Sequence, residues 1–110
     1  MITEKFIRHV LWHAENAPDE NFLVLIDYAS DLYEVERILD FSNISHPTKL
    51  SSIKIDNIEF LYCGVNMMSE KLRGRKIENL YCLTKNIQVL QTLRFKMLYV
   101  EETGYYYETD

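Results

Sequence analysis

Four cations stand close together in the second half of this 110-residue chain, within the stretch EKLRGRKIENLYCLTKN at residues 70–86. The four residues are Lys71, Arg73, Arg75 and Lys76. Such a cluster can bind the phosphates of a nucleic acid or another anion, and Gly74 would let a phosphate approach the backbone closely. It is equally typical of a solvated loop that leads into a buried strand. The sequence leaves both interpretations open.

The net charge of -5 conceals an uneven distribution of charge along the chain. Residues 71–96 contain seven of the twelve Lys and Arg residues but one of the seventeen Asp and Glu residues. This segregation can mark an anion-binding face on an acidic body, and it can also arise by chance in a short chain. A nucleic-acid-binding module that uses the basic face at residues 71–96 is therefore our alternative function.

Two histidines could share a metal ion. His9 and His13 are four residues apart in a predicted helix, so they lie on one helical face. A third ligand is not evident, because His46 lies in a remote loop and Glu15 belongs to another part of the helix surface. The H-E-x-x-H signature is also missing. We predict no metal site and no cofactor.

Acidic and thiol side chains give little indication of catalysis. Asp27 lies near the carboxyl end of a predicted strand, where open α/β sheets bind ligands, but with Asp31 and Glu34 it fits a turn and a helix N-terminus better. Cys63 and Cys82 lie in apolar runs, which fits buried thiols of a reducing compartment better than a disulfide, although a bridge between adjacent strands stays open. Neither cysteine has a histidine partner nearby in the sequence, and no G-x-S-x-G elbow occurs. We predict that the protein is not an enzyme.

Tyrosine dominates the aromatic content, with eight residues in the chain. Three of them are consecutive: Tyr105, Tyr106 and Tyr107. Side chains alternate along a strand, so either Tyr106 or the other two should lie outside unless something covers them. Tyrosine combines a large contact area with a hydrogen-bonding tip. We therefore predict a protein interface at this C-terminal edge, with another protein or with a second copy of the chain, and the acidic body of the protein is the other candidate docking surface.

Hydrophobic periodicity predicts the elements that must position these residues. In chain order they are a helix (3–17), a strand (21–29), a helix (31–40), a connection (41–51), a hairpin around residues 56–57, a strand (77–84), a short helix (87–93), a strand (95–101) and a last short edge strand. Ser30 is the expected N-cap of the second helix. The hairpin should bury one face formed by Ile53, Ile55, Ile58 and Phe60.

This order of elements predicts one α/β domain, residues 1–110, with a mixed, mostly parallel sheet of about five strands and helices packed on it. No apolar run approaches the length of a membrane span, and charges interrupt the N-terminal segment where a signal peptide would be apolar. We expect a soluble, cytoplasmic protein without membrane contact.

Four segments carry a resemblance to a known family. They are KFIRHVLWHAENAPDENFLVLI, a helix leading to a hydrophobic strand; IKIDNIEFLYCG, a hairpin; EKLRGRKIENLYCLTKN, a loop with an Arg-Gly pair before a strand; and RFKMLYVEETG, a further strand. In this order they resemble the central part of the P-loop ATPase core of phage terminase large subunits and related helicases. The resemblance covers residues 5–104.

The chain departs from that family where the chemistry would occur. A G-x-x-x-x-G-K-[ST] phosphate-binding loop is absent. The Walker B strand should end in acids that organise magnesium, but Leu83, Thr84 and Lys85 stand there. The resemblance thus implies a degenerate core without ATP hydrolysis, such as a phage-type accessory or anti-host factor that acts by binding in the host cytoplasm. Residual nucleotide binding is a third alternative.

Overall fold

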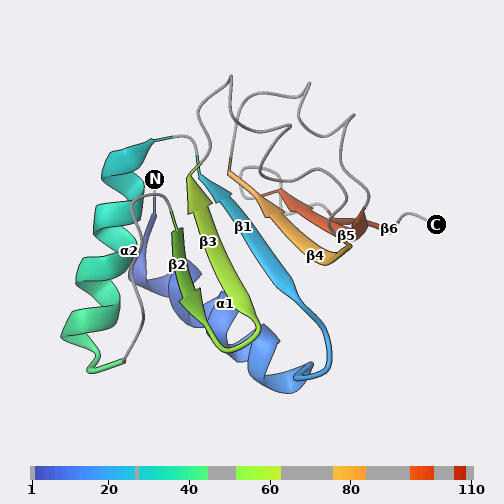
Figure 1. The fold of residues 1–110 in the computed structure, drawn as a ribbon, viewed down its shortest axis with the longest axis horizontal. Helices are drawn as coiled ribbons and strands as arrows, with labels where there is room; N and C mark the ends of the chain where they lie inside the picture. The colour runs from blue at the N-terminus through green and yellow to red at the C-terminus, as the bar shows by residue number, and fades with distance from the viewer. Residues whose placement is uncertain are drawn as a thin grey trace.

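The computed structural model describes residues 2–26, 28–44, 52–62 and 76–83, together with the backbone of residues 95–100 and 106–108. The elements are α1 (Glu4–Asn16), β1 (Phe22–Ile26), α2 (Ala29–Phe41), β2 (Ser52–Ile55), β3 (Ile58–Tyr62), β4 (Ile77–Cys82), β5 (Phe95–Val100) and β6 (Tyr106–Glu108) (Figure 1). These elements match the predicted order. The helix expected at residues 87–93 lies outside the described residues.

The described strands form one six-stranded sheet in the order β2-β3-β1-β4-β5-β6. The four inner strands run parallel to one another. Strand β1 forms parallel ladders with β3 on one side and β4 on the other, and β4 forms a parallel ladder with β5. Both outermost pairs, β2 with β3 and β5 with β6, are antiparallel. The predicted α/β class with a mixed, mostly parallel sheet is confirmed, with six strands where we expected about five.

Strand β1 is buried on both of its faces. Phe22, Val24 and Ile26 belong to the core that the sheet shares with the helices. Leu23 and Leu25 alternate with them and are also buried, so they point to the opposite face of the sheet. This explains why the sequence of β1 is an unbroken apolar run, as is typical of a strand covered on two sides.

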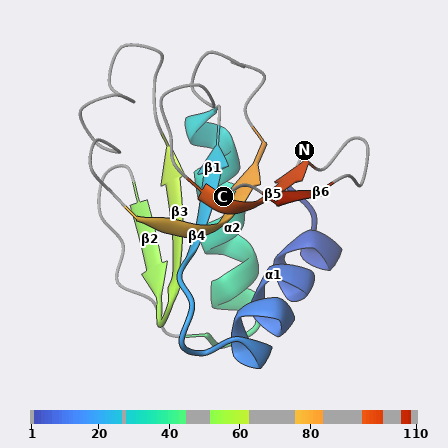
Figure 2. The same cartoon turned by 90° about the vertical axis from the view of Figure 1, so that its right-hand side faces the viewer.

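The two helices lie beside each other and pack on the same core (Figure 2). Each contributes an apolar stripe at helical spacing: Ile7, Val10 and Ala14 from α1, and Leu32, Val35, Ile38 and Leu39 from α2. These stripes meet Phe22, Val24 and Phe60 of the sheet. The buried residues of both helices thus recur at the spacing that is typical of amphipathic helices.

The two helices begin differently. Thr3 is the N-cap of α1, and its Oγ1 accepts a hydrogen bond from the Phe6 N–H at 3.1 Å. Our prediction of Ser30 as the N-cap of α2 is wrong, because the helix begins at Ala29 and Tyr28 is its N-cap. The Asp31 N–H donates to the Tyr28 carbonyl at 3.0 Å, so Ser30 is already within the first helical turn.

Helix α2 ends in a Schellman motif. Asn43 has a positive φ of 59°, its N–H donates to the Asp40 carbonyl, and the Ile44 N–H donates to the Leu39 carbonyl. Ile44 then packs against the core. This arrangement satisfies carbonyls that would otherwise lack partners at the helix end.

The β2–β3 hairpin has the predicted two-residue turn, Asp56-Asn57, and Asp56 has a positive φ of 48°. Its expected apolar face is confirmed, since all four residues belong to the core: Ile53, Ile55, Ile58 and Phe60. On the other face, Lys54 Nζ and Glu59 Oε2 form an ion pair at 3.4 Å between register partners.

Candidate functional site

The predicted site residues divide between described and undescribed parts of the chain. Of the basic cluster, Lys76 is described, whereas Lys71, Arg73 and Arg75 lie outside the described residues. Of the tyrosine cluster, Tyr106 and Tyr107 form part of the β6 backbone, and Tyr105 lies outside. Asp27 and Cys63 also lie outside, and Cys82 is buried in β4 as predicted.

Lys76 lies at the amino-terminal edge of the parallel strands. It immediately precedes β4, it is exposed, and its carbonyl accepts a hydrogen bond from Asn21 Nδ2 at 2.8 Å. Open α/β sheets bind ligands at the opposite edge, outside the carboxyl ends of their strands. Lys76 therefore does not belong to the ligand position expected for this class of fold.

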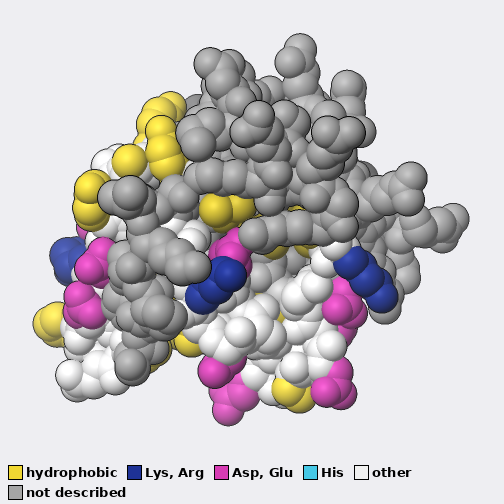
Figure 3. All heavy atoms as spheres, in the orientation of Figure 1, with side chains coloured by type: hydrophobic (Ala, Val, Ile, Leu, Met, Phe, Trp, Pro, Cys, Tyr) yellow, Lys and Arg dark blue, Asp and Glu magenta, His cyan; other side chains and the backbone are white. Residues whose placement is uncertain are grey.

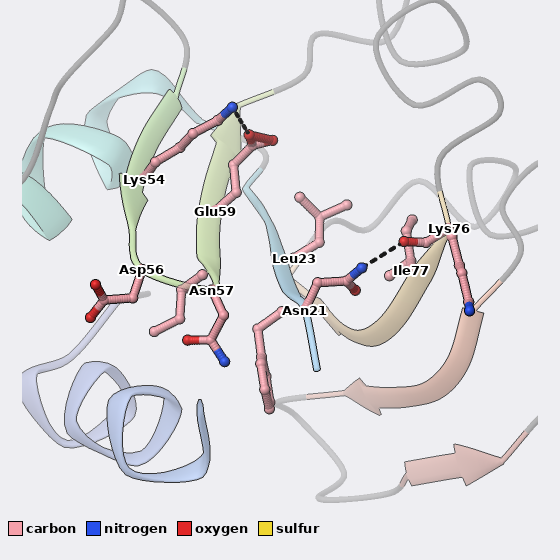
Figure 4. A pocket seen from close by; sticks show the side chains of 10 residues that line it. Asn21, Leu23, Lys54, Asp56, Asn57, Glu59, Lys76 and Ile77 are labelled. Atoms are coloured by element: carbon pink, nitrogen blue, oxygen red, sulfur yellow. Dashed lines mark hydrogen bonds and ion pairs between the residues drawn. The ribbon is translucent and has the colours of Figure 1, made fainter. Parts of the chain in front are cut away.

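A pocket of about 300 Å³ opens beside Lys76 (Figure 4). Its lining combines apolar residues with two cations and two acids: Asn21, Phe22, Leu23, Lys54, Asp56, Asn57, Ile58, Glu59, Lys76 and Ile77. The Lys54 ammonium is paired with Glu59, whose side chain is 12% exposed. Because the charges balance, the pocket has no strong preference for an anion.

The described surface also lacks a patch of one charge on the face drawn in Figure 3, where blue and magenta side chains are interspersed.

Large apolar side chains are exposed on both helices. Trp12 on α1 is 61% exposed, and Phe41 at the end of α2 is 83% exposed. Tyr28 and Tyr33, at the start of α2, are exposed as well, and exposed aromatic side chains are ordinary on protein surfaces.

Asparagines hold the amino-terminal edge together. Asn57 Nδ2 lies within hydrogen-bond distance of three carbonyls at the end of α1, those of Ala14, Ala17 and Glu20, at 3.2, 3.2 and 2.9 Å. The Asn57 carbonyl accepts from the Phe22 N–H at 2.8 Å. One residue thus joins the hairpin turn, the end of α1 and the start of β1.

Asn79 is the buried polar residue of β4. Its Nδ2 donates to the Asn21 carbonyl at 3.2 Å and lies 3.4 Å from Glu20 Oε1. Sequence patterns missed the structural role of Asn21, Asn57 and Asn79. One signal was present: Asn79 interrupts an apolar strand, and a buried amide must find hydrogen-bond partners.

A histidine and aromatic cluster joins α1 to the sheet. His13 Nδ1 and the Tyr81 hydroxyl share a hydrogen bond at 2.7 Å, and the His13 ring meets Phe22 edge-on at a centroid distance of 4.7 Å. Phe6 packs edge-on against Tyr81 at 5.8 Å. Burial lowers the pKa of His13, His9 lowers it further, and Glu20 acts in the opposite direction.

His9 and His13 lie side by side, with ring centroids 6.2 Å apart, as their spacing predicted. Across the described ranges, no group of three or more His, Cys, Asp or Glu side chains could hold a metal ion. His13 instead uses one ring nitrogen to bind Tyr81. In the described structure this histidine pair therefore contributes to helix packing.

One row of register partners crosses the whole sheet and ends at the tyrosine edge. The row is Ile53, Phe60, Val24, Tyr81, Tyr99 and Tyr106. Tyr81 contacts α1 through its hydrogen bond with His13. The backbone of its strand, β4, pairs with β5, and β5 pairs with β6. The predicted edge position of the C-terminal strand is thus present in the fold.

No protein-family model, curated protein or solved structure matches this chain. The resemblance to the P-loop ATPase core accordingly stays a prediction. Among the residues that the structure describes, no helix is both long enough and apolar enough to span a membrane.

Proposed function

We propose that this protein is a non-enzymatic interaction protein that docks another protein through its C-terminal tyrosine edge, defined as β6 with Tyr106 and Tyr107. The observation that carries the proposal is the position of β6 at one end of the strand order. A strand at the end of a sheet can pair with a strand of another chain, and tyrosines strengthen such contacts. A phage-type accessory or anti-host factor in the host cytoplasm, on a degenerate ATPase-like core, would act in this way.

The opposite end of the sheet is less suited to docking. Strand β2 is the last strand there, and Ser52, Ile53 and Ile55 are buried. Little of β2 is therefore open to a second chain, and its exposed residue, Lys54, is a charged residue of the kind that discourages pairing at sheet edges. This contrast favours β6 as the docking strand, and it makes Lys54 of β2 a suitable control position for experiments on β6.

Site-specific photocrosslinking tests the proposal. A benzophenone amino acid at position 107 should crosslink the partner, whereas the same group at position 54 should not. A product of twice the chain mass in the purified protein would identify a second copy, and a product formed only in host extract would identify a different protein. Equal crosslinking at both positions, or none at position 107, would contradict docking at β6.

Sedimentation of the purified chain provides an independent measurement. If the partner is a second copy, the mass should rise with concentration, and Tyr106→Ala with Tyr107→Ala should abolish the rise. A Tyr33→Ala variant, at an exposed tyrosine of α2, is the matched control and should behave as the native chain does. A concentration-dependent mass that survives the double substitution would exclude β6 as the contact.

Nucleic-acid binding is the second candidate function, and the exposure of Lys76 at the end of the basic cluster favours it. An Arg73→Ala and Arg75→Ala variant should then lose affinity for an oligonucleotide and show a flatter dependence on salt. Fluorescence anisotropy at about 20 and 150 mM salt would measure both. Absence of binding by the native chain at the lower salt concentration would remove this candidate.

Residual nucleotide binding belongs to the same ATPase-like interpretation. We expect no heat when ATP and magnesium are titrated into the protein, because the chain has neither the phosphate-binding loop nor acids at residues 83–85. A saturable heat signal with ATP would contradict a purely protein-binding role.

A further inference from the structure

A hollow of about 440 Å³ lies between the start of α1 and the second half of α2. Both helices line it with apolar and charged side chains: Ile2, Glu4, Glu34, Arg37, Ile38 and Phe41. Ile2 and Ile38 belong to the core, whereas Phe41 is largely exposed. The volume is in the range of protein pockets that bind ligands. The hollow can therefore receive an apolar side chain of another molecule beside Phe41.

Phe41 ends a line of exposed side chains on α2. Tyr33, Arg37 and Phe41 are each four residues apart and all three are exposed, so they lie on one face of the helix, here called the α2 line. The Arg37 guanidinium donates to its helix neighbour Glu34 through both Nε and Nη2. Aromatic residues and arginine are the residue types that protein interfaces favour. A single exposed aromatic residue is ordinary, but this line leads to a hollow.

Acidic side chains dominate the charge of α2. The helix contains one cation, Arg37, and four acids: Asp31, Glu34, Glu36 and Asp40. Glu36 and Asp40 are three residues from Tyr33 and Arg37 respectively, so they border the α2 line on the same face. In Figure 3, hydrophobic side chains lie near both ends of α2, on the left of the view, with acidic ones between them. This face therefore attracts cations and repels anions.

We propose that the hollow and the α2 line form a docking surface for a basic segment of a different protein. An apolar side chain of that segment enters the hollow, and its Lys or Arg side chains lie beside Glu36 and Asp40. The charge of α2 selects the partner, and the apolar anchor supplies affinity. Helix α2 packs on β1, β2 and β3, at the end of the sheet away from β6, so this surface is separate from the C-terminal tyrosine edge.

Selection of short random peptides on the purified chain tests this docking surface with defined probes. Peptides that bind the native chain but not a Tyr33→Ser and Phe41→Ser variant should be rich in Lys and Arg and should contain a large apolar residue. Both positions are exposed, so the variant should keep its fold, which circular dichroism checks. A selection that yields no peptide of this kind, or yields peptides without an excess of basic residues, would overturn the proposal.

Fluorescence anisotropy of a selected peptide measures the contribution of charge. The dissociation constant should rise about three- to tenfold in a Glu36→Gln and Asp40→Asn variant. It should also rise between about 0.01 and 1 M salt, where the screening length falls from about 30 to 3 Å. An affinity that neither change affects would contradict a basic partner.

Two further variants separate this surface from β6 and from self-association. Tyr106→Ala with Tyr107→Ala should bind the selected peptide as tightly as the native chain does, and loss of binding would place the peptide at β6 instead. In sedimentation, Tyr33→Ser with Phe41→Ser should have the same mass as the native chain at every concentration. A mass that rises with concentration in the native chain but not in this variant would assign the surface to a second copy and overturn the proposal.

Discussion

Asn21 and Glu78 exchange hydrogen bonds in both directions at the start of two parallel strands. The Glu78 N–H donates to Asn21 Oδ1 at 2.7 Å, and the Asn21 N–H lies 3.3 Å from Glu78 Oε1. Asn21 Nδ2 also donates to the Lys76 carbonyl, and the Asn21 carbonyl accepts from the Asn79 N–H. Every polar group of Asn21 therefore bonds to residues 76–79, and this residue fixes the register of β1 against β4.

Replacing Asn21 by alanine should destabilise the fold. Asn21→Ala removes two side-chain hydrogen bonds, each worth about 0.5–1.5 kcal/mol, so the free energy of unfolding should fall by about 1–3 kcal/mol. Urea denaturation followed by circular dichroism measures this change. Asn16→Ala is the matched control, because the Asn16 side chain bonds to the Trp12 carbonyl within one exposed helix end. Equal losses in the two variants would contradict a special role for Asn21.

At position 57, a negative charge should destabilise the fold more than the loss of the side chain does. Asn57→Ala removes the amide that lies within hydrogen-bond distance of the Ala14, Ala17 and Glu20 carbonyls and should cost about 1–3 kcal/mol. Asn57→Asp keeps the shape but points a carboxylate at the same carbonyls, so it should cost more than alanine at pH 7. Thermal and urea denaturation of both variants would check this order. A more stable aspartate variant would show that the amide donor is unimportant.

Asn43 offers a stabilising substitution. Its φ of 59° is a conformation that glycine adopts without the steric cost of a β-carbon, so Asn43→Gly should raise the free energy of unfolding by up to about 1 kcal/mol. Asn43→Val should lower it by about 1–2 kcal/mol, because a β-branched residue is strained at positive φ. If valine and glycine prove equally stable, the Schellman ending of α2 does not contribute as described.

Both faces of β1 should respond strongly to cavities. Leu25 and Ile26 point to opposite faces and are each nearly inaccessible, so Leu25→Ala and Ile26→Ala should each cost about 2–5 kcal/mol. Phe41→Ala is a control at an exposed apolar residue and should change the stability by less than about 0.5 kcal/mol. If Leu25→Ala lowers the free energy of unfolding only slightly, the face of the sheet that carries Leu23 and Leu25 is loosely packed.

Much of the fold could be predicted because local patterns determined it. The apolar stripes of α1 and α2, the unbroken apolar run of β1 and the alternation around Asp56 each have a period that sterics and burial impose. The N-cap of α2 was predicted at the wrong residue because Ser30 has the side chain that is preferred there, whereas the helix begins at Ala29 and its N-cap, Tyr28, makes no side-chain capping hydrogen bond.

The candidate site was harder to predict because it depends on contacts between distant residues. His13 and Tyr81 are 68 positions apart, and neither has a neighbour in the sequence that indicates the other. The asparagine contacts likewise join Asn21 to residues 76–79 and Asn57 to the end of α1. Such pairs follow from strand order, and the position of β1 between β3 and β4 is not encoded in any short motif.

The position of β1 between β3 and β4 also determines how the chain can fold. The β2–β3 hairpin joins neighbouring residues and can form within microseconds. Strand β1 must instead find Ile58 and Asn79, both far along the chain, before its parallel ladders exist. Closing these long loops costs entropy before the contacts form, so we expect the docking of β1 to limit the folding rate, with an already formed hairpin as its template.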